Sequence, residues 1–90
     1  MKKKEIAQWL YDKILEEQVV FQYDAVREVE KKFGEKYIYV NDNGNKAIDK
    51  KITSAFRDIN KDNLIEWDRY DFKWVLRLSD EEAEDLLNRL

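Results

Sequence analysis

The side chains best suited to chemistry in this sequence are cationic and cluster between residues 46 and 61. This segment holds five cationic side chains and two carboxylates, in a chain whose net charge is −3. A helix turns by about 100° per residue, so a helix here would gather four polar side chains within about 60° of arc. The four are Lys50, Ser54, Arg57 and Lys61. Because arginine and lysine bind phosphate and guanine edges, the segment predicts an anion-binding helix face.

Double-stranded DNA is the first anion that such a face fits, because an α-helix can enter the major groove. We expect Ser54 and Arg57 to approach bases there, and the lysines to hold phosphates. The complete predicted set is Lys46, Lys50, Lys51, Ser54, Arg57, Lys61 and Arg69. Two other interpretations stay open: the ordinary solvated side of an amphipathic helix, and a face that binds an acidic protein surface.

Three tyrosines form a second candidate site, for contact with a partner. Tyr37 and Tyr39 would share one face of an extended segment, because alternate side chains of a strand point the same way. Tyr70 stands beside Arg69 in a predicted turn. Exposed tyrosines can stack on a base or on a side chain of a partner. Seven other aromatic residues are predicted to pack in the core: Trp9, Phe21, Phe33, Phe56, Trp67, Phe72 and Trp74.

Several kinds of active site are excluded by residues that the sequence lacks. There is no cysteine and no histidine, which removes thiolate nucleophiles, the commonest general base and the commonest metal ligand. Gly34 and Gly44 are the only glycines, so no glycine-rich loop can cradle a phosphate. Adjacent carboxylates such as Glu16 and Glu17 would point about 100° apart on a helix. We therefore expect a non-enzymatic binding protein that uses no cofactor and no metal.

The composition is typical of one small folded domain. The 90 residues are 43% hydrophobic and 41% charged, which supplies both a core and a polar surface. No run approaches the roughly 20 apolar residues that cross a bilayer, and polar side chains interrupt the beginning of the chain. We expect a cytoplasmic protein with no membrane contact.

The spacing of apolar residues predicts the elements that must position these candidates. Helices are expected at about 3–17 and from Gln22 or Asp24 to about Phe33, with a short strand at 19–21 between them. Gly34 is placed to end the second helix. A hairpin or extended segment then follows at 37–48, because a strand-like run there meets an Asn-Gly turn signal.

The second half of the chain is predicted as a helix at about 50–60, hairpin strands at 63–67 and 72–78, and a closing helix at 79–90. Asp49 can cap the first of these helices by accepting backbone N–H groups of its first turn. Ser79 with Glu82 three residues later is typical of a capping box. The leucines of the closing helix suit burial against the first helix or against a second copy. In the second case the protein would form a homodimer through terminal helices.

Without the closing helix, this order resembles a winged helix-turn-helix domain over about residues 3–78. The most specific part is 52-ITSAFRDINKDNLIEWDRYDFKWVLRL-78, in which an apolar helix stripe leads through a polar turn to a Leu-Ile pair and a returning strand. The resemblance implies that the third helix recognises DNA and that the last hairpin is the wing. A looser likeness links the Tyr-rich segment, the Asn-Gly-Asn turn and the following Ala-Ile-Asp to small bacterial proteins of unknown function.

Two features depart from the winged-helix pattern. About 15 residues separate the second and third helices, where the family usually has a tight turn. Asp68 and Asp71 stand beside Arg69 at the wing tip, so the tip lacks the basic character that usually grips a phosphate backbone. The first departure affects the angle between the second and third helices. The second affects which partner the wing can bind.

The predicted fold is thus a winged-helix-like α+β domain over residues 1–90, with a core at about 3–78 and a C-terminal helix at 79–90. The predicted function is a binding module, with DNA as the first partner and a role as a regulator or accessory protein. The alternative is a protein-interaction or accessory module of a mobile element or phage that makes no direct nucleic-acid contact.

Overall fold

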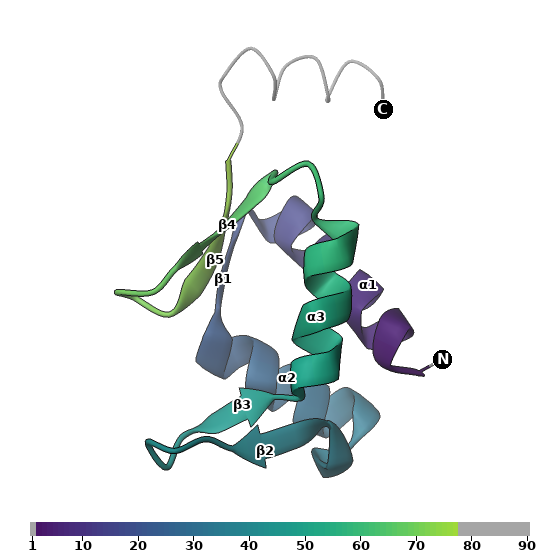
Figure 1. The fold of residues 1–90 in the computed structure, drawn as a ribbon, viewed down its shortest axis with the longest axis vertical. Coiled ribbons are helices and arrows are strands. Elements are labelled where there is room, and N and C mark those ends of the chain that lie inside the picture. Colours follow the sequence, from purple (N-terminus) through teal and green to yellow (C-terminus); the bar gives the residue numbers. More distant parts are fainter. Residues whose placement is uncertain (1, 78–90) are drawn as a thin grey trace.

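Over residues 2–77, which the computed structural model describes, the chain forms three α-helices, a three-stranded sheet and a separate β-hairpin (Figure 1). In chain order the elements are α1 (Lys2–Glu17), β1 (Val19–Phe21), α2 (Gln22–Phe33), the 3-10 helix η1 (Glu35–Tyr37), β2 (Ile38–Val40), β3 (Lys46–Ile48), α3 (Lys50–Ile59), β4 (Ile65–Asp68) and β5 (Lys73–Leu76). The predicted closing helix at 79–90, and the homodimer contact that it would make, lie outside the described residues.

Strand β1 joins β4 and β5 in an antiparallel sheet with the order β1-β5-β4. We call the β4–β5 hairpin, residues 65–76, the wing. Trp74 pairs with Val20 on one side and Trp67 on the other, so these three side chains lie on one face. Trp74 is 7% exposed, and its ring centre is 6.0 Å from that of Phe56 in α3. That face therefore packs against α3, which completes the predicted winged-helix-like α+β arrangement.

The long connection between α2 and α3 folds as a hairpin of its own, in which β2 and β3 pair antiparallel. The side-chain oxygen of Asn41 accepts hydrogen bonds from the N–H groups of Asn43 and Asn45, both at 3.0 Å. Gly44 has a φ of 79°, which glycine adopts without strain. The predicted Asn-Gly turn is therefore confirmed. The turns of this hairpin and of the wing project beyond the same side of α3 (Figure 1).

The core lies where the three helices meet the inner face of the sheet, and α3 packs mainly against α1 (Figure 1). Ile52 and Phe56, the buried side chains of α3, are 0% and 4% exposed. The apolar stripe predicted for this helix is thus buried, and its cationic side remains on the surface. Across residues 2–77, no helix has both the length and the apolar character needed to cross a membrane.

Candidate nucleic-acid interface

The outer face of α3 and the turn after it carry most of the predicted cationic residues. We call Lys50, Ser54, Arg57 and Lys61, all of them exposed, the cationic stripe. Lys51 lies beside the stripe and is exposed as well. Within the part of the chain that the structure describes, neither Lys51 nor the three cations of the stripe forms an ion pair. No carboxylate of residues 2–77 therefore neutralises their charge.

Asp49 holds the beginning of α3 in place. Its carboxylate accepts a hydrogen bond from the Lys51 N–H at 2.7 Å, which confirms the predicted N-cap. Its other oxygen lies 3.2 Å from the ammonium of Lys3 in α1. Burial alone would raise the pKa of Asp49, but the Lys51 N–H and the Lys3 ammonium stabilise the charged form and hold that pKa below its ordinary value. A charged group thus anchors the first turn of α3 to α1.

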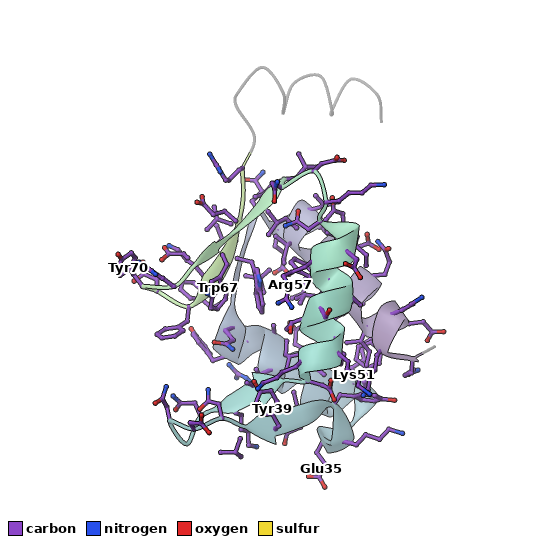
Figure 2. The ribbon with its side chains drawn as sticks, viewed as in Figure 1. Glu35, Tyr39, Lys51, Arg57, Trp67 and Tyr70 are labelled. Carbon is purple, nitrogen blue, oxygen red and sulfur yellow. The ribbon has the colours of Figure 1, made fainter. Side chains whose placement is uncertain are left out.

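Asn60 fastens the other end of α3 to the wing. Its amide nitrogen donates to the Ile65 carbonyl at 2.8 Å, and its amide oxygen accepts from the Ile65 N–H at 3.1 Å. Arg57 lies about 60° from Asn60 around the helix, whereas Lys51 lies on the opposite side. Figure 2 accordingly shows Arg57 on the side of α3 that faces the wing and Lys51 on the far side. The wing therefore borders one edge of the cationic stripe.

Lys46 and Tyr39 come from the β2–β3 hairpin, just before α3. The Lys46 ammonium lies 3.0 and 3.2 Å from the two carboxylate oxygens of Glu30 in α2. The Lys50 ammonium lies 5.7 Å from the ring centre of the half-buried Tyr39. Tyr39 is therefore next to the stripe, as a partner-binding residue would be, whereas Lys46 already has a carboxylate partner inside the domain.

The prediction that Tyr37 and Tyr39 share an exposed face is wrong. Residues 35–37 form η1 instead of the start of a strand, and the Tyr37 ring turns into the core, where it is 7% exposed. The Tyr37 carbonyl accepts a hydrogen bond from the Asp49 N–H at 2.8 Å. Tyr37 therefore supports the beginning of α3 and is not available to a partner.

Three of the five charged side chains of the wing form ion pairs. The Lys73 ammonium lies 3.7 Å from an oxygen of Asp71, and the Arg77 guanidinium lies 3.4 Å from an oxygen of Glu66. Both pairs join residues of the sheet and its flanks rather than reaching across to α3. The wing therefore differs from α3, whose cations are free of such partners in the described domain.

The tip of the wing is an ordered turn that exposes Arg69 and Tyr70. One oxygen of Asp68 accepts hydrogen bonds from the N–H groups of Tyr70 and Asp71, at 2.9 and 3.2 Å. The Arg69 guanidinium lies 5.4 Å from the ring centre of Tyr70, which is 81% exposed. Tyr70 marks the end of the wing farthest from α3 (Figure 2). The structure thus places both predicted residues on the surface but apart from the cationic stripe.

Trp67 and Phe72 are exposed, although the sequence predicts that both are buried. Trp67 is 40% exposed and Phe72 is 59% exposed. The Trp67 ring centre lies 4.9 Å from that of buried Trp74 and 6.3 Å from that of Phe72. Period-two spacing correctly puts Trp67 on the inner face of the wing. The wing extends past the helices, however, so the outer part of that face is left uncovered (Figure 1).

Phe72 also has an unusual backbone conformation. Its φ of 54° lies in the left-handed region, which costs a residue with a side chain about 1 kcal/mol. Its carbonyl accepts a hydrogen bond from the Gln22 N–H, at the beginning of α2, at 2.8 Å. This arrangement holds the Phe72 ring on the surface beside α2.

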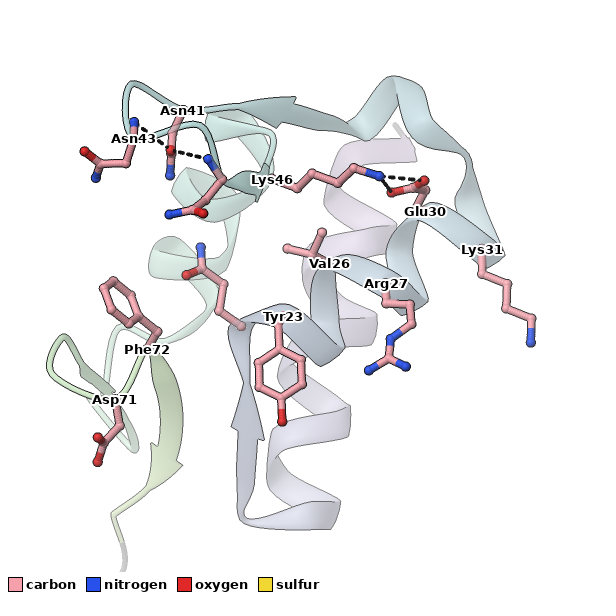
Figure 3. A pocket seen from close by; sticks show the side chains of 12 residues that line it. Tyr23, Val26, Arg27, Glu30, Lys31, Asn41, Asn43, Lys46, Asp71 and Phe72 are labelled. Carbon is pink, nitrogen blue, oxygen red and sulfur yellow. Dashed lines mark hydrogen bonds and ion pairs between the residues drawn. The ribbon is translucent and has the colours of Figure 1, made fainter.

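A groove of about 790 Å³ opens between the tips of the two hairpins and the beginning of α2, a volume within the range of ligand sites. Two rings, four side-chain amides, one valine and charged groups of both signs line it: Phe72, Tyr23, Gln22, Asn41, Asn43, Asn45, Val26, Arg27, Lys31, Lys46, Glu30 and Asp71. Figure 3 shows Phe72 from the wing, Tyr23 and Arg27 from α2, and Asn43 from the β2–β3 turn around this groove. Among the described residues, no group of three His, Cys, Asp or Glu side chains could hold a metal ion.

Residues 2–76 match DUF6953, a family of unknown function. The chain belongs to this family. The match to DUF6953 extends from α1 to β5, so it includes the cationic stripe, the wing and the groove. No curated protein and no solved structure matches the chain.

The DUF6953 domain gathers some of the predicted residues and separates others. Lys50, Lys51, Ser54 and Arg57 are exposed on α3, and Lys61 is exposed in the turn that follows it. Arg69 and Tyr70 lie at the wing tip, whereas Lys46 and Tyr37 are engaged within the domain. Trp67 and Phe72 are surface residues that the sequence pattern missed. The polar turn 68-DRYD-71 between them was the available signal, because residues next to a solvent-exposed turn are the first to leave the core.

Proposed function

We propose that this domain is a non-enzymatic DNA-binding module that places α3 in the major groove of a duplex. The observation that carries the proposal is the cationic stripe, whose charges have no carboxylate partner within residues 2–77. Cations left free on one helix face are suited to phosphates, because binding then displaces only counterions and breaks no ion pair. The winged-helix-like arrangement supports the proposal, and we propose membership of the winged-helix superfamily with it.

The size of α3 supports a contact with the major groove. An α-helix with its side chains is about 10–12 Å across, which fits a major groove roughly 12 Å wide, and the ten residues of α3 would extend for about 15 Å along it. Arg57, on the wing side, would donate two hydrogen bonds to a guanine edge, and Ser54 would approach a neighbouring base. Lys50 and Lys61, toward the two ends of the stripe, would contact phosphates on either side. We propose a cytoplasmic location with it.

The proposal is tested by fluorescence anisotropy with a labelled duplex of about 20 base pairs at two salt concentrations. Each phosphate contact adds about −0.9 to the slope of log affinity against log salt. If the three lysines Lys50, Lys51 and Lys61 contact phosphates, affinity falls roughly 40-fold between about 50 and 200 mM salt. No binding near 50 mM salt would exclude a duplex as the partner.

Paired substitutions then show whether α3 is the surface responsible. Lys50→Ala combined with Arg57→Ala should weaken binding and reduce the salt slope by about one contact, because Lys50 contacts a phosphate whereas Arg57 contacts a base. Lys32→Ala combined with Lys36→Ala removes the same charge from other exposed positions and is the matched control. Equal losses in the two double variants would mean that only net charge matters and that α3 makes no specific contact.

Protein binding through the wing is a second candidate function, because exposed aromatic rings near paired charges are typical of protein interfaces. Trp67, Tyr70 and Phe72 supply such rings. In this case the domain would be an interaction or accessory module, such as one from a mobile element or phage, and would not touch nucleic acid. A partner that co-purifies from cells and is lost with Tyr70→Ala, but retained with Lys50→Ala and Arg57→Ala, would favour this function.

A further inference from the structure

The wing is a surface that contact between α3 and a duplex does not explain. It borders the cationic stripe at Arg57 and is bonded to α3 through Asn60, so a nucleic acid on α3 would lie against it. Yet the Lys73 and Arg77 charges are already paired with carboxylates, and Asp68 adds a negative charge. Arg69 forms no ion pair among residues 2–77, but it stands beside Tyr70 at the end of the wing farthest from α3. A phosphate backbone would gain little there, because phosphate contacts require free cations.

The wing offers a platform of aromatic rings instead. Trp67 is 40% exposed on the face directed toward α3, with buried Trp74 behind it at 4.9 Å and Phe72 at its edge. The hydrogen bonds to Asp68 keep the adjoining turn ordered. Unpaired bases stack on exposed aromatic rings, and this contact needs no charge. Bases inside a duplex are already covered on both faces by their neighbours, so they cannot use such a platform.

The groove beside Phe72 has the groups that would receive a strand leaving the platform. Tyr23, 64% exposed, provides a second ring across from the wing. The side-chain amides of Asn43 and Asn45 each offer donors and an acceptor for a base edge. Lys31 is exposed and forms no ion pair among residues 2–77, so it is open to a phosphate. Phe72 joins platform and groove, because its ring centre lies 6.3 Å from that of Trp67 and the same residue lines the groove.

We propose that the domain takes DNA in which a single strand adjoins a duplex, with the duplex on α3 and the first unpaired bases stacked on Trp67 and Phe72. This inference rests on the proposed function, because α3 must hold the duplex part. The wing then distinguishes a junction from an uninterrupted duplex. Trp67 supplies the stacking surface, and the groove receives the bases that follow.

The test compares three labelled DNAs by fluorescence anisotropy: a blunt duplex, the same duplex with a single-stranded overhang, and the overhang strand alone. The overhang duplex should bind at least about fivefold more tightly than the blunt duplex, since one stacked base contributes that much or more. The single strand should bind more weakly than the overhang duplex, because it leaves the α3 contacts to a duplex unmade.

Variants assign the preference to the wing. Trp67→Ala should remove the preference for the overhang while leaving blunt-duplex affinity unchanged, and Trp67→Phe should retain it. Phe72→Asn removes a ring without requiring a new backbone conformation, because asparagine tolerates the left-handed region, and should reduce the preference. Val40→Ser alters a comparably exposed apolar residue outside the wing and should have no effect. Circular dichroism melting confirms that each variant is folded.

The outcomes separate this inference from the proposed function. If the blunt duplex binds and the overhang adds nothing, the junction preference is overturned while duplex binding by α3 stands. If Trp67→Ala weakens all three DNAs equally, the wing has only a structural effect and the inference fails. If none of the DNAs binds, both proposals fail, and a protein partner for the wing becomes the better account.

Discussion

Replacement of Asp49 by alanine tests how α3 is held in the orientation that exposes its cations. The Asp49 carboxylate caps α3 by accepting from the Lys51 N–H at 2.7 Å, and it pairs with Lys3 of α1 at 3.2 Å. Asp49→Ala removes both interactions, whereas Asp49→Asn keeps a cap acceptor and removes only the charge. The two variants therefore separate the cap from the ion pair.

The magnitude follows from these two contacts. Loss of an N-cap costs about 1 kcal/mol. The Lys3 and Asp49 side chains are 32% and 26% exposed, so their pair belongs at the upper end of surface ion pairs, about 0.5–1 kcal/mol. Asp49→Ala should therefore lower the free energy of unfolding by about 1.5–2 kcal/mol, or roughly 10 °C in Tm for a domain of this size. Asp49→Asn should lose only about 0.5–1 kcal/mol.

The pH dependence supplies an independent check. Because the pKa of Asp49 is lower in the folded protein than its ordinary value of 3.8, the folded state favours the charged carboxylate. The resulting stability is fully present above the unfolded pKa and is lost as the pH falls through the folded pKa. The difference between wild type and Asp49→Asn should thus be constant from about pH 5 to 7 and shrink below about pH 4.

Urea unfolding followed by tryptophan fluorescence at neutral pH and near pH 3 measures these differences. Two results would refute the reasoning. One is a loss below about 0.3 kcal/mol for Asp49→Ala, which would mean that neither contact stabilises α3. The other is an equal loss for the alanine and asparagine variants, which would mean that the capping hydrogen bond makes no measurable contribution to the free energy of unfolding.

Three further predictions concern stability, and each is measured by urea unfolding against wild type. Asn60→Ala should cost about 1–3 kcal/mol, because it removes both hydrogen bonds that join α3 to Ile65; a smaller loss would show that the wing holds its position without them. Gly34→Ala should cost about 1–3 kcal/mol, because the Gly34 backbone has a φ of 115° and a ψ of 155°, which suit only glycine. Gly44→Asn should be nearly neutral, because asparagine tolerates a φ of 79°. Equal losses of stability in the two variants would contradict these backbone arguments. Tyr37→Ala should cost about 3–5 kcal/mol, as expected for the loss of a large buried ring, while Tyr37→Phe should change stability little. A loss well below this range for Tyr37→Ala would contradict the burial of the Tyr37 ring.

The elements of this fold follow from local rules that can be applied to the sequence. The spacing of apolar residues identifies the helices, and Asp49 and Gly44 supply a cap and a turn whose chemistry acts within a few residues. The opposition of Ile52 and Phe56 to the cationic stripe is likewise a property of one helix. Such features are predictable because they depend on neighbours along the chain.

The errors involve residues whose environment comes from elsewhere. Tyr37 would lie on an extended face if β2 began earlier, but η1 turns its ring into the core. Trp67 and Phe72 alternate as buried strand residues do, yet the wing extends past the helices that would cover them. In each case the local pattern predicted a strand or the face of a strand. Whether the side chain is buried depended on the other elements that pack against it.

The sequence by itself thus determined the helices, the two hairpins and the side of α3 that carries positive charge, because periodicity and capping act over a few residues. Only the tertiary structure decided which charges and rings remain available. Lys46 and Lys50 look alike in the sequence, but Glu30, 16 residues from Lys46, binds one of them and leaves the other beside Tyr39. Ion pairing and burial depend on groups that folding brings together from distant positions, and these decide what the surface can bind.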